Sequence, residues 1–322
     1  MRNVPGRKTD VADSVWIAQL LAHGLVRPSA VPPRPIRDLR DLTRYRRRLV
    51  EARTREVQRL DKLMQDAGIK LTSVSSRLLT KSGLAMIEAM VAGQTDPQAL
   101  AELAKGRLRA KIPQLRQALT GRFRVEHHGL LARRMLTHIR FLEAGIADLD
   151  VQIDRLIAPF APMLELVRTI PGVDRVVGIC LIAELGVDMT IFPSAAHLAS
   201  WAGICPGNHA SGGRRRSGAT RRGPVWLRIA LTEAAHAASR TRGTYLAAHH
   251  AQVRGRRGIP KAIGATRHDI LIAYWHILAT GTPYQDLGPD WHRTPQAIDA
   301  QARRLVAQLE ALGKTVTIHN AA

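Results

Sequence analysis

A regular repeat of isoleucine and leucine between Leu131 and Ile157 restricts the fold of this chain more than any other feature. Its members are Ile139, Leu142, Ile146, Leu149, Ile153 and Leu156, at steps that alternate between three and four residues. This spacing is the seam of a left-handed coiled coil, and alternating isoleucine and leucine is typical of two-stranded arrangements. The segment therefore predicts a long helix that needs a partner helix, and Pro159 and Pro162 end it.

Two partners for this helix are open. The stretch Ile36–Ala67 is a second long-helix candidate, rich in Arg, Leu and Glu, and Gly68 ends it. The alternative partner is the same segment of another protomer. We favour a hairpin within one chain, because the two helices have similar lengths and enclose residues 69–124, where glycines and prolines separate short helical pieces. These pieces predict a compact helical tip.

Asp10 and Asp13 are the candidate metal ligands near the start of the sequence. Thr9 or Asp10 can cap a helix there, and a spacing of three residues places both carboxylates on one side of its first turn. Such a pair can hold a divalent cation beside a phosphate. The alternative is that the helix macrodipole alone favours acids at these positions. The proline-rich stretch Pro28–Pro35 separates this helix from the rest of the chain.

The charge of the chain indicates a polyanionic partner. The net charge is +22 and most of the excess is arginine, which favours nucleic acid. No apolar run approaches the roughly 20 residues that span a bilayer, and the polar N-terminus lacks a signal-peptide core, so we expect a cytoplasmic protein without membrane contact. The two cysteines, Cys180 and Cys205, form no metal-binding pattern and are expected to be buried thiols.

The sequence LVRTIPGVDRVVGICLIAELG (166–186) predicts a helix, a turn and a second helix. The turn at residues 170–173 resembles a helix-hairpin-helix element, whose backbone N–H groups bind phosphate. Asp174 stands where a second glycine is usual in that element. A turn that serves packing alone is equally compatible with this sequence.

A basic loop follows, GICPGNHASGGRRRSGATRRGPVWL (203–227), and it contains no carboxylate. It combines glycines with three hydroxyl side chains and five arginines: Ser211, Ser217 and Thr220, with Arg214, Arg215, Arg216, Arg221 and Arg222. Glycine lets backbone N–H groups approach an anion closely, and the guanidinium fork matches phosphate oxygens. A hydroxyl held there could attack a phosphodiester. A loop that only lies on a nucleic-acid backbone has the same composition.

These segments together resemble a known family. The motifs 166–186, FPSAAHLASWAGICPGNHASGGRRRSGATRRG (192–223), TYLAAHH and PYQDLG are similar to the C-terminal domain of insertion-sequence transposases that have a DEDD-type, RuvC-like N-terminal domain. The stretches VPGRKTDVADSVWIAQLLAHGLVRPSAVPP and RDLRDLTRYRRRLVEARTREVQRL extend the resemblance over nearly the whole chain. Members of this family are guided by a bridge RNA.

The resemblance implies specific site residues. The nucleophilic serine of the family lies in a Ser-x-Gly element, which here is Ser211 followed by Gly213, and Ser217 is the alternative. Asp10 and Asp13 match the last two carboxylates of the DEDD set. The first two have no counterpart, so the sequence is expected to be an N-terminally shortened transposase whose strand exchange is weak or absent. Pro224 also departs from the family, which usually carries asparagine there.

The resemblance further implies a mainly α fold with three parts. Residues 1–33 are expected to be the remnant of the RuvC-like, RNase H-like (α/β) domain, residues 34–160 a coiled-coil arm with a helical tip, and residues 161–322 the C-terminal transposase domain. The expected activity is DNA recombination: the serine attacks a DNA phosphate, Mg²⁺ held by the carboxylates assists, and the basic loop with Gly213 contacts nucleic acid. DNA, a structured guide RNA and further copies of the chain, as a dimer or tetramer, are the expected partners.

Two other functions fit the residues. One is an architectural nucleic-acid-binding protein without chemistry. The other is a metal-dependent nuclease in which Asp10 and Asp13 act with water as the nucleophile. Glu233 and His236, on the helix after the basic loop, could act as acid or base near Ser211, although a surface role is favoured.

Overall fold

The computed structural model describes residues 9–26, 31–205, 210–212, 214–215, 220–291 and 295–317, with only the backbone described at 210, 211, 214, 215, 295–298, 300 and 301. It is mainly α-helical, as expected, and the strands of the described residues are two residues long each. None of the helices in these ranges is long and apolar enough to cross a membrane.

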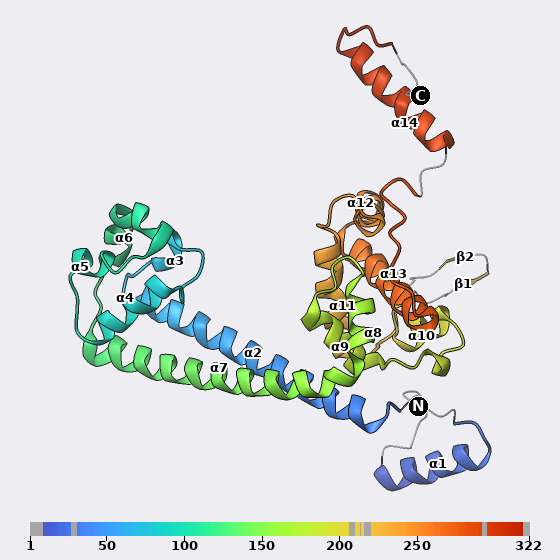
Figure 1. The fold of residues 1–322 in the computed structure, drawn as a ribbon, viewed down its shortest axis with the longest axis horizontal. Helices are drawn as coiled ribbons and strands as arrows, with labels where there is room; N and C mark the ends of the chain where they lie inside the picture. The colour runs from blue at the N-terminus through green and yellow to red at the C-terminus, as the bar shows by residue number, and fades with distance from the viewer. Residues whose placement is uncertain are drawn as a thin grey trace.

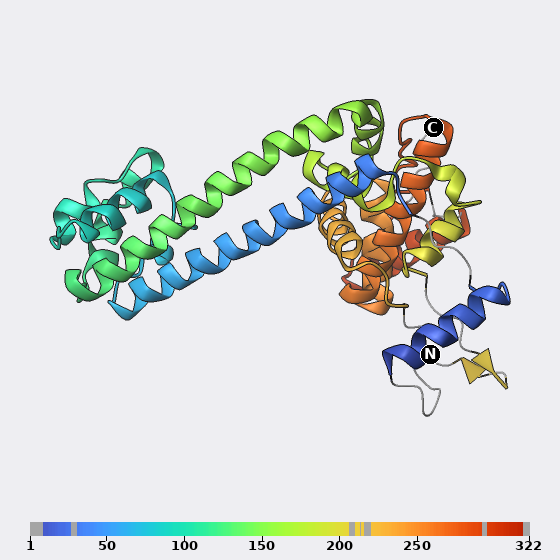
Figure 2. The same cartoon turned by 90° about the horizontal axis from the view of Figure 1, so that it is seen from below.

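An arm of two long antiparallel helices is the most extended part of the molecule (Figures 1 and 2). Helix α2 (Arg34–Asp66) packs along α7 (Leu130–Ile157), which confirms the predicted hairpin within one chain. Of the repeat residues, Ile139, Leu142 and Ile153 are buried against the partner helix. At the far end, His128 Nε2 lies 3.3 Å from Asp66 Oδ2, so the two helices meet again where the tip begins.

The tip forms a small core of its own at the end of the arm. It contains α3 (Leu71–Val74), α4 (Lys81–Val91), α5 (Pro97–Ala101), η1 (Gly106–Lys111), α6 (Ile112–Leu119) and η2 (Val125–Gly129). Met86, Ile87 and Leu115 are fully buried there and pack with Met64 of α2. The tip thus buries the apolar faces of helices too short to be stable alone.

A helical bundle follows the arm. It contains η3 (Ala158–Phe160), α8 (Ala161–Arg168), α9 (Arg175–Leu185), η4 (Met189–Ile191), α10 (Ala195–Trp201), α11 (Val225–Ala238), α12 (Tyr245–Arg257) and α13 (Ile259–Thr280). Its core is built on α11 and α13, where Leu231, Ala234 and Tyr274 are fully buried. The Tyr274 hydroxyl donates a hydrogen bond of 2.6 Å to the Gly186 carbonyl.

The turn at residues 170–173 serves packing. A Cβ added at Gly172 would lie 2.4 Å from the Ala234 carbonyl oxygen, so the turn rests directly on α11. The Asp174 carboxylate accepts a hydrogen bond of 2.8 Å from the Val177 N–H and caps α9. The carboxylate takes an N–H at this helix start and the glycine faces α11, so these contacts support the packing role of the turn. Phosphate binding at the turn stays a prediction.

Two helices lie apart from the bundle (Figure 1). Helix α1 (Asp10–Ala22) buries none of its residues. It is the one helix in the described part of residues 1–33. Helix α14 (Pro295–Ala311) extends beyond the bundle at the other end of the chain. The bundle and the arm therefore form the scaffold that holds the candidate site.

Candidate nucleic-acid interface

The two ends of the basic loop are held against each other by glycines. A Cβ added at Gly223 would lie 1.9 Å from the Ala202 carbonyl oxygen, and one at Gly203 would lie 2.8 Å from the Gly223 nitrogen. Gly203 also has a φ of +67°, which side chains rarely adopt. Ala202 and Ile204 are buried in the bundle core. The loop thus leaves and re-enters the bundle at one closed base, between α10 and α11.

A tight hairpin carries Ser211. Strand β1 (Ala210–Ser211) pairs antiparallel with β2 (Arg214–Arg215), with Ser211 opposite Arg214. Gly212, which directly follows Ser211, has a φ of +59°, in the left-handed region that tight hairpin turns require. The serine backbone therefore lies in the last pair before the turn. The side chains of Ser211, Arg214 and Arg215, and residues Gly213, Arg216 and Ser217 altogether, lie outside what the structure describes.

The cations on the exit side of the loop are exposed. Arg221 and Arg222 are solvent-accessible, and α11 begins three residues later. The Trp226 ring of α11 faces the arm, where the guanidinium carbons of Arg44 and Arg48 lie 5.9 Å and 5.5 Å from its centroid. The start of α11 is thus fixed on its arm side while its loop side stays open.

Asp10 and Asp13 occupy the first turn of α1, as predicted. Thr9 caps the helix, since its Oγ1 accepts a hydrogen bond of 3.2 Å from the Ala12 N–H. Asp10 is exposed, and no group of three or more His, Cys, Asp or Glu side chains in the described ranges could hold a metal ion. Two carboxylates suit Mg²⁺ only with further ligands such as phosphate oxygens and water. Figure 1 shows α1 apart from the β1–β2 hairpin, so this arrangement does not bring the two aspartates to Ser211.

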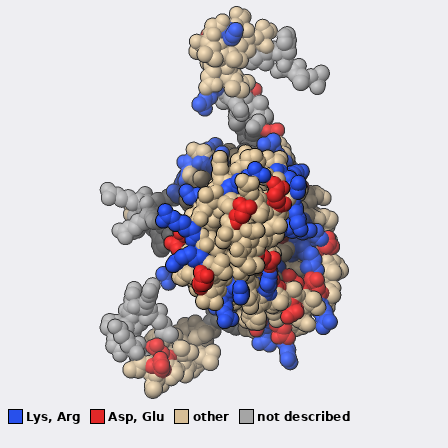
Figure 3. Space-filling model, turned by 90° about the vertical axis from the view of Figure 1, so that its left-hand side faces the viewer, with Lys and Arg blue, Asp and Glu red and all other residues tan. Residues whose placement is uncertain are grey.

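The bundle is strongly cationic around the loop. Between residues 189 and 268 the sequence carries twelve arginines and Lys261 against one carboxylate, Glu233. That carboxylate is an ion-pair partner, because its Oε1 lies 2.5 Å from Arg47 Nη1 of the arm. The favoured surface role of Glu233 is therefore confirmed. The face of the tip differs, since Figure 3 shows Lys and Arg beside Asp and Glu there.

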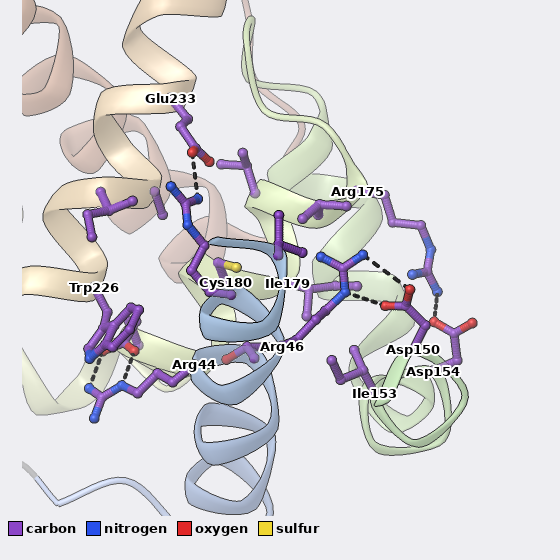
Figure 4. Close-up of a pocket in the computed structure, with 18 residues that line it drawn as sticks. Arg44, Arg46, Asp150, Ile153, Asp154, Arg175, Ile179, Cys180, Trp226 and Glu233 are labelled. Carbon is purple, nitrogen blue, oxygen red and sulfur yellow. Dashed lines mark hydrogen bonds and ion pairs between the residues drawn. The ribbon is translucent and has the colours of Figure 1, made fainter. Parts of the chain in front are cut away.

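An ion-paired joint fastens the arm to the bundle (Figure 4). The Arg44 guanidinium donates to both Glu184 carboxylate oxygens, from Nε at 2.7 Å and from Nη2 at 2.8 Å. Arg40 donates to the last carbonyls of α9, at Ala183 (2.8 Å) and Glu184 (3.0 Å). Since the Glu184 side chain is only 4% exposed, the hydrogen bond from Arg44 to a buried carboxylate raises the pKa of Arg44. Sequence reasoning missed this joint, although a single Glu in the apolar helix 175–185 was its signal.

A cavity of about 250 Å³ lies beside this joint. Ion pairs line its rim, with Arg46 on Asp150 and Arg175 on Asp154, and the labelled side chains of Figure 4 come from the arm and from α9 and α11. Cys180 lies on its wall, where burial raises the pKa of the thiol to about 11. The thiol is therefore protonated at neutral pH and is no nucleophile.

A second polar cluster joins α12 to α13. His249 Nδ1 lies 2.6 Å from Asp269 Oδ2, and the His249 ring stacks on Tyr245. The hydrogen bond to Asp269 raises the pKa of His249, although burial opposes the shift. Burial raises the pKa of Asp269, but hydrogen bonds from His249 and His268 outweigh it, so the net shift is downward. Asp269 lines an open cavity of about 550 Å³, together with Tyr245 and Tyr284.

Comparisons with known proteins agree with this arrangement. Residues 164–251, which include the closed loop base and the β1–β2 hairpin, match the model of the transposase family IS116/IS110/IS902. Residues 1–69 match the model of the DEDD transposase domain of IS110 elements. A Pseudomonas aeruginosa protein described as a probable family 20 transposase is 26% identical over 238 residues, which are 74% of this chain.

The aligned region is 61% of that relative, so this chain spans about three fifths of the length of the curated protein it matches. The shortened N-terminus that the missing carboxylates suggest stays a prediction. Two family models match at the two places where the resemblance was expected, in the expected order. The chain belongs to the IS110 family of transposases: the DEDD domain model matches residues 1–69, and the model of the IS116/IS110/IS902 family matches residues 164–251.

Proposed function

We propose that this chain catalyses DNA strand exchange with Ser211 as the nucleophile. The observation that carries the proposal is the pairing of β1 with β2, which sets the Ser211 backbone opposite Arg214 on a loop whose ends are closed by Gly203 and Gly223. This loop lies inside the region that matches the transposase model. A short turn on a fixed base limits the positions that a side chain can take, which favours a defined attack geometry.

The chemistry assigned to Ser211 is a pair of transesterifications. Its Oγ loses a proton and bonds to a DNA phosphorus, while the bond from phosphorus to one sugar oxygen breaks and that oxygen takes up a proton. The hydroxyl of a different strand then attacks the phosphoserine and releases the serine hydroxyl. Loop arginines supply positive charge to the phosphate oxygens during both steps. In this proposal they are Arg214, Arg215, Arg216, Arg221 and Arg222, with the backbone N–H of Gly213.

The metal and the partners belong to the same proposal. Asp10 and Asp13 would hold Mg²⁺ together with phosphate oxygens of the DNA, and the ion would neutralise charge on the phosphate. Residues 1–33 are assigned to the RuvC-like domain, residues 34–160 to the arm and residues 161–322 to the transposase domain. Since α1 lies apart from the hairpin in one chain, the aspartates and Ser211 come together through movement of α1 or across two copies of a dimer or tetramer. A structured guide RNA supplies the sequence choice.

Trapping a covalent protein–DNA adduct tests the nucleophile. The full chain is incubated with end-labelled DNA of the insertion-sequence ends, its guide RNA and Mg²⁺, and denaturing electrophoresis then measures the adduct. We expect Ser211→Ala to reduce the adduct at least 100-fold while Ser217→Ala retains it. Chelation of Mg²⁺, or Asp10→Asn with Asp13→Asn, should reduce it as well.

Other outcomes identify the other candidates. Loss of the adduct in Ser217→Ala alone would move the nucleophile to Ser217. Mg²⁺-dependent free ends without any adduct would indicate a water-using nuclease. DNA binding that is equal in every variant, with neither adduct nor cleavage, would leave an architectural nucleic-acid-binding protein.

A further inference from the structure

Two arginines on neighbouring bundle helices have no carboxylate partner. Arg228 of α11 and Arg267 of α13 take part in none of the ion pairs within the described ranges. They lie close enough for their charges to interact: burial, and then the charge of Arg228, lower the pKa of Arg267. Like charges that interact without a counter-ion repel each other, so this arrangement lowers stability.

Contacts to α11 hold the Arg267 guanidinium in place. Its Nη1 donates to the Thr232 hydroxyl at 3.4 Å, and Thr232 Oγ1 in turn donates to the Arg228 carbonyl at 2.6 Å. Among the described residues, Arg267 Nε is the one buried side-chain nitrogen or oxygen atom that has no hydrogen-bond partner. A charged donor enclosed without an acceptor is costly, about 1–3 kcal/mol for a buried polar group and more for an ion. The protein thus fixes a cationic fork and leaves its charge uncompensated.

The two arginines lie at the foot of the serine loop. Helix α11 begins at Val225, two residues after Gly223 of the closed loop base, and Arg228 is three residues further on. Three residues correspond to about 4.5 Å along a helix axis. A polymer that lies across the base of the loop would therefore pass this part of α11.

The neighbouring helix α12 carries more cations. Burial lowers the pKa of His250 on α12, and the charges of Arg254, His236 and His249 lower it further, so these groups lie near His250. His250 Nδ1 lies 3.1 Å from the hydroxyl of Thr266, the residue before Arg267. The one carboxylate between residues 189 and 268 is Glu233, and it pairs with Arg47 of the arm. No acidic side chain of this segment is left to neutralise the fork.

We propose that Arg228 and Arg267 together hold a single backbone phosphate of the DNA strand that lies on the serine loop. A phosphate offers oxygen acceptors to both guanidinium forks and compensates the charge that they share. The contact carries no sequence information and sets the position of the strand beside the loop. The identity of the polymer as DNA rests on the proposed function, whereas the phosphate chemistry rests on the two arginines alone.

The salt dependence of DNA binding tests this proposal. Equilibrium binding of the full chain to a 30-base-pair duplex is measured between about 50 and 300 mM salt for the wild type, Arg228→Gln, Arg267→Gln and the double variant. Each single variant should lower the slope of log K against log salt by about one unit and weaken binding about three- to tenfold at 100 mM salt, for every duplex sequence alike. Because both arginines hold one phosphate, the double variant should lose no more slope than either single variant.

Three controls accompany the binding measurement. Arg140→Gln removes an arginine of the arm that pairs with Glu88 of the tip, and it should leave the slope unchanged. The melting temperature of Arg267→Gln should stay close to that of the wild type, because removal of the charge repulsion offsets the loss of the hydrogen bond to Thr232. Arg267→Lys keeps the charge but loses the fork, so it should retain part of the slope.

Specific results would overturn the proposal. An unchanged slope in Arg267→Gln, additive losses of two units in the double variant, or a loss seen with single-stranded RNA and not with DNA would each do so. The nucleophile test is independent. A Ser211-dependent adduct with unchanged slopes would remove the phosphate site and keep the proposed function, and lowered slopes without any adduct would do the reverse.

Discussion

At the scale of single residues, the pair of His249 and Asp269 shows how helix packing creates a coupled group. The motif TYLAAHH is visible in the sequence, but its histidine gains a carboxylate partner twenty residues away only because α12 packs on α13. The contact lowers the pKa of Asp269 and raises that of His249, so both side chains are charged over a common pH range. The pair therefore stabilises the bundle within a defined pH window.

This pair should make the stability of the bundle depend on pH in both directions. A histidine with a raised pKa contributes stability that is complete below its ordinary value near 6.5 and is lost as the pH rises through the folded value above it. A carboxylate with a lowered pKa contributes stability above its ordinary value near 3.8, and that stability is lost as the pH falls below it.

We therefore expect the contribution of the pair to be largest between about pH 4 and 6.5, where a charged hydrogen bond is worth about 1.5–3 kcal/mol. Urea unfolding of the wild type and of His249→Gln at a series of pH values measures it. The stability difference between the two proteins should shrink above pH 7. A difference that stays constant from pH 5 to 9 would contradict the assignment, and His276→Gln, an exposed histidine on α13, is the matched control.

At the scale of elements, the arm was predictable and its attachment was not. The repeat in α7 predicted a long helix, and the length of residues 36–67 favoured the hairpin, because both signals are local periodicities. The joint depends on long-range geometry: Arg40 and Arg44 of α2 reach the end of α9, about 140 residues later in the chain. Periodicity reveals which face of a helix is apolar, but it does not reveal which helix end an arginine meets.

Glu184→Gln should weaken the joint. Removing the charge leaves Arg44, and the partly buried Arg40, without the carboxylate at the end of α9. Breaking a buried ion pair from one side costs about 3–5 kcal/mol. Urea unfolding measures the loss, and hydrogen exchange should show faster opening at the base of α2. Glu165→Gln, at an exposed pair with Arg168, should change the stability by less than about 1 kcal/mol. Equal losses in the two variants would contradict a special role for the joint.

At the scale of the whole molecule, the apolar cores are separate. One core lies in the tip, a second in the bundle, and a small third one joins the arm base to α9 through Ile36, Ile153 and Ile179. The tip core and the bundle core share no residue, and the arm helices connect them (Figure 2). The chain should therefore unfold in parts rather than in one step.

Substitutions in the two cores should act locally. Met86→Ala in the tip and Leu231→Ala in the bundle each remove a fully buried side chain, which costs about 2–5 kcal/mol. Hydrogen exchange followed by mass spectrometry should show faster exchange only in residues 69–128 for the first variant and only in the bundle for the second. If either variant accelerated exchange equally in both regions, the molecule would be one cooperative unit.

The sequence alone predicted the helical class, the hairpin and the position of the loop, because composition and spacing determine these locally. It left the role of the turn at residues 170–173 open, and its packing role became visible only through the contact of Gly172 with α11. The fork of Arg228 and Arg267 was also invisible, since 39 positions separate the two residues and their approach depends on how α11 packs on α13.

The contact between Gly203 and Gly223 also affects how a protein of this kind can diverge. Because the chain departs from and returns to the same point, residues can be inserted or deleted between these glycines without shifting α10 or α11, and loop-closure entropy grows only slowly with length. Changes in that segment should therefore leave the folding of the bundle unaffected. New target or partner preferences could arise there while the surrounding helices keep their packing.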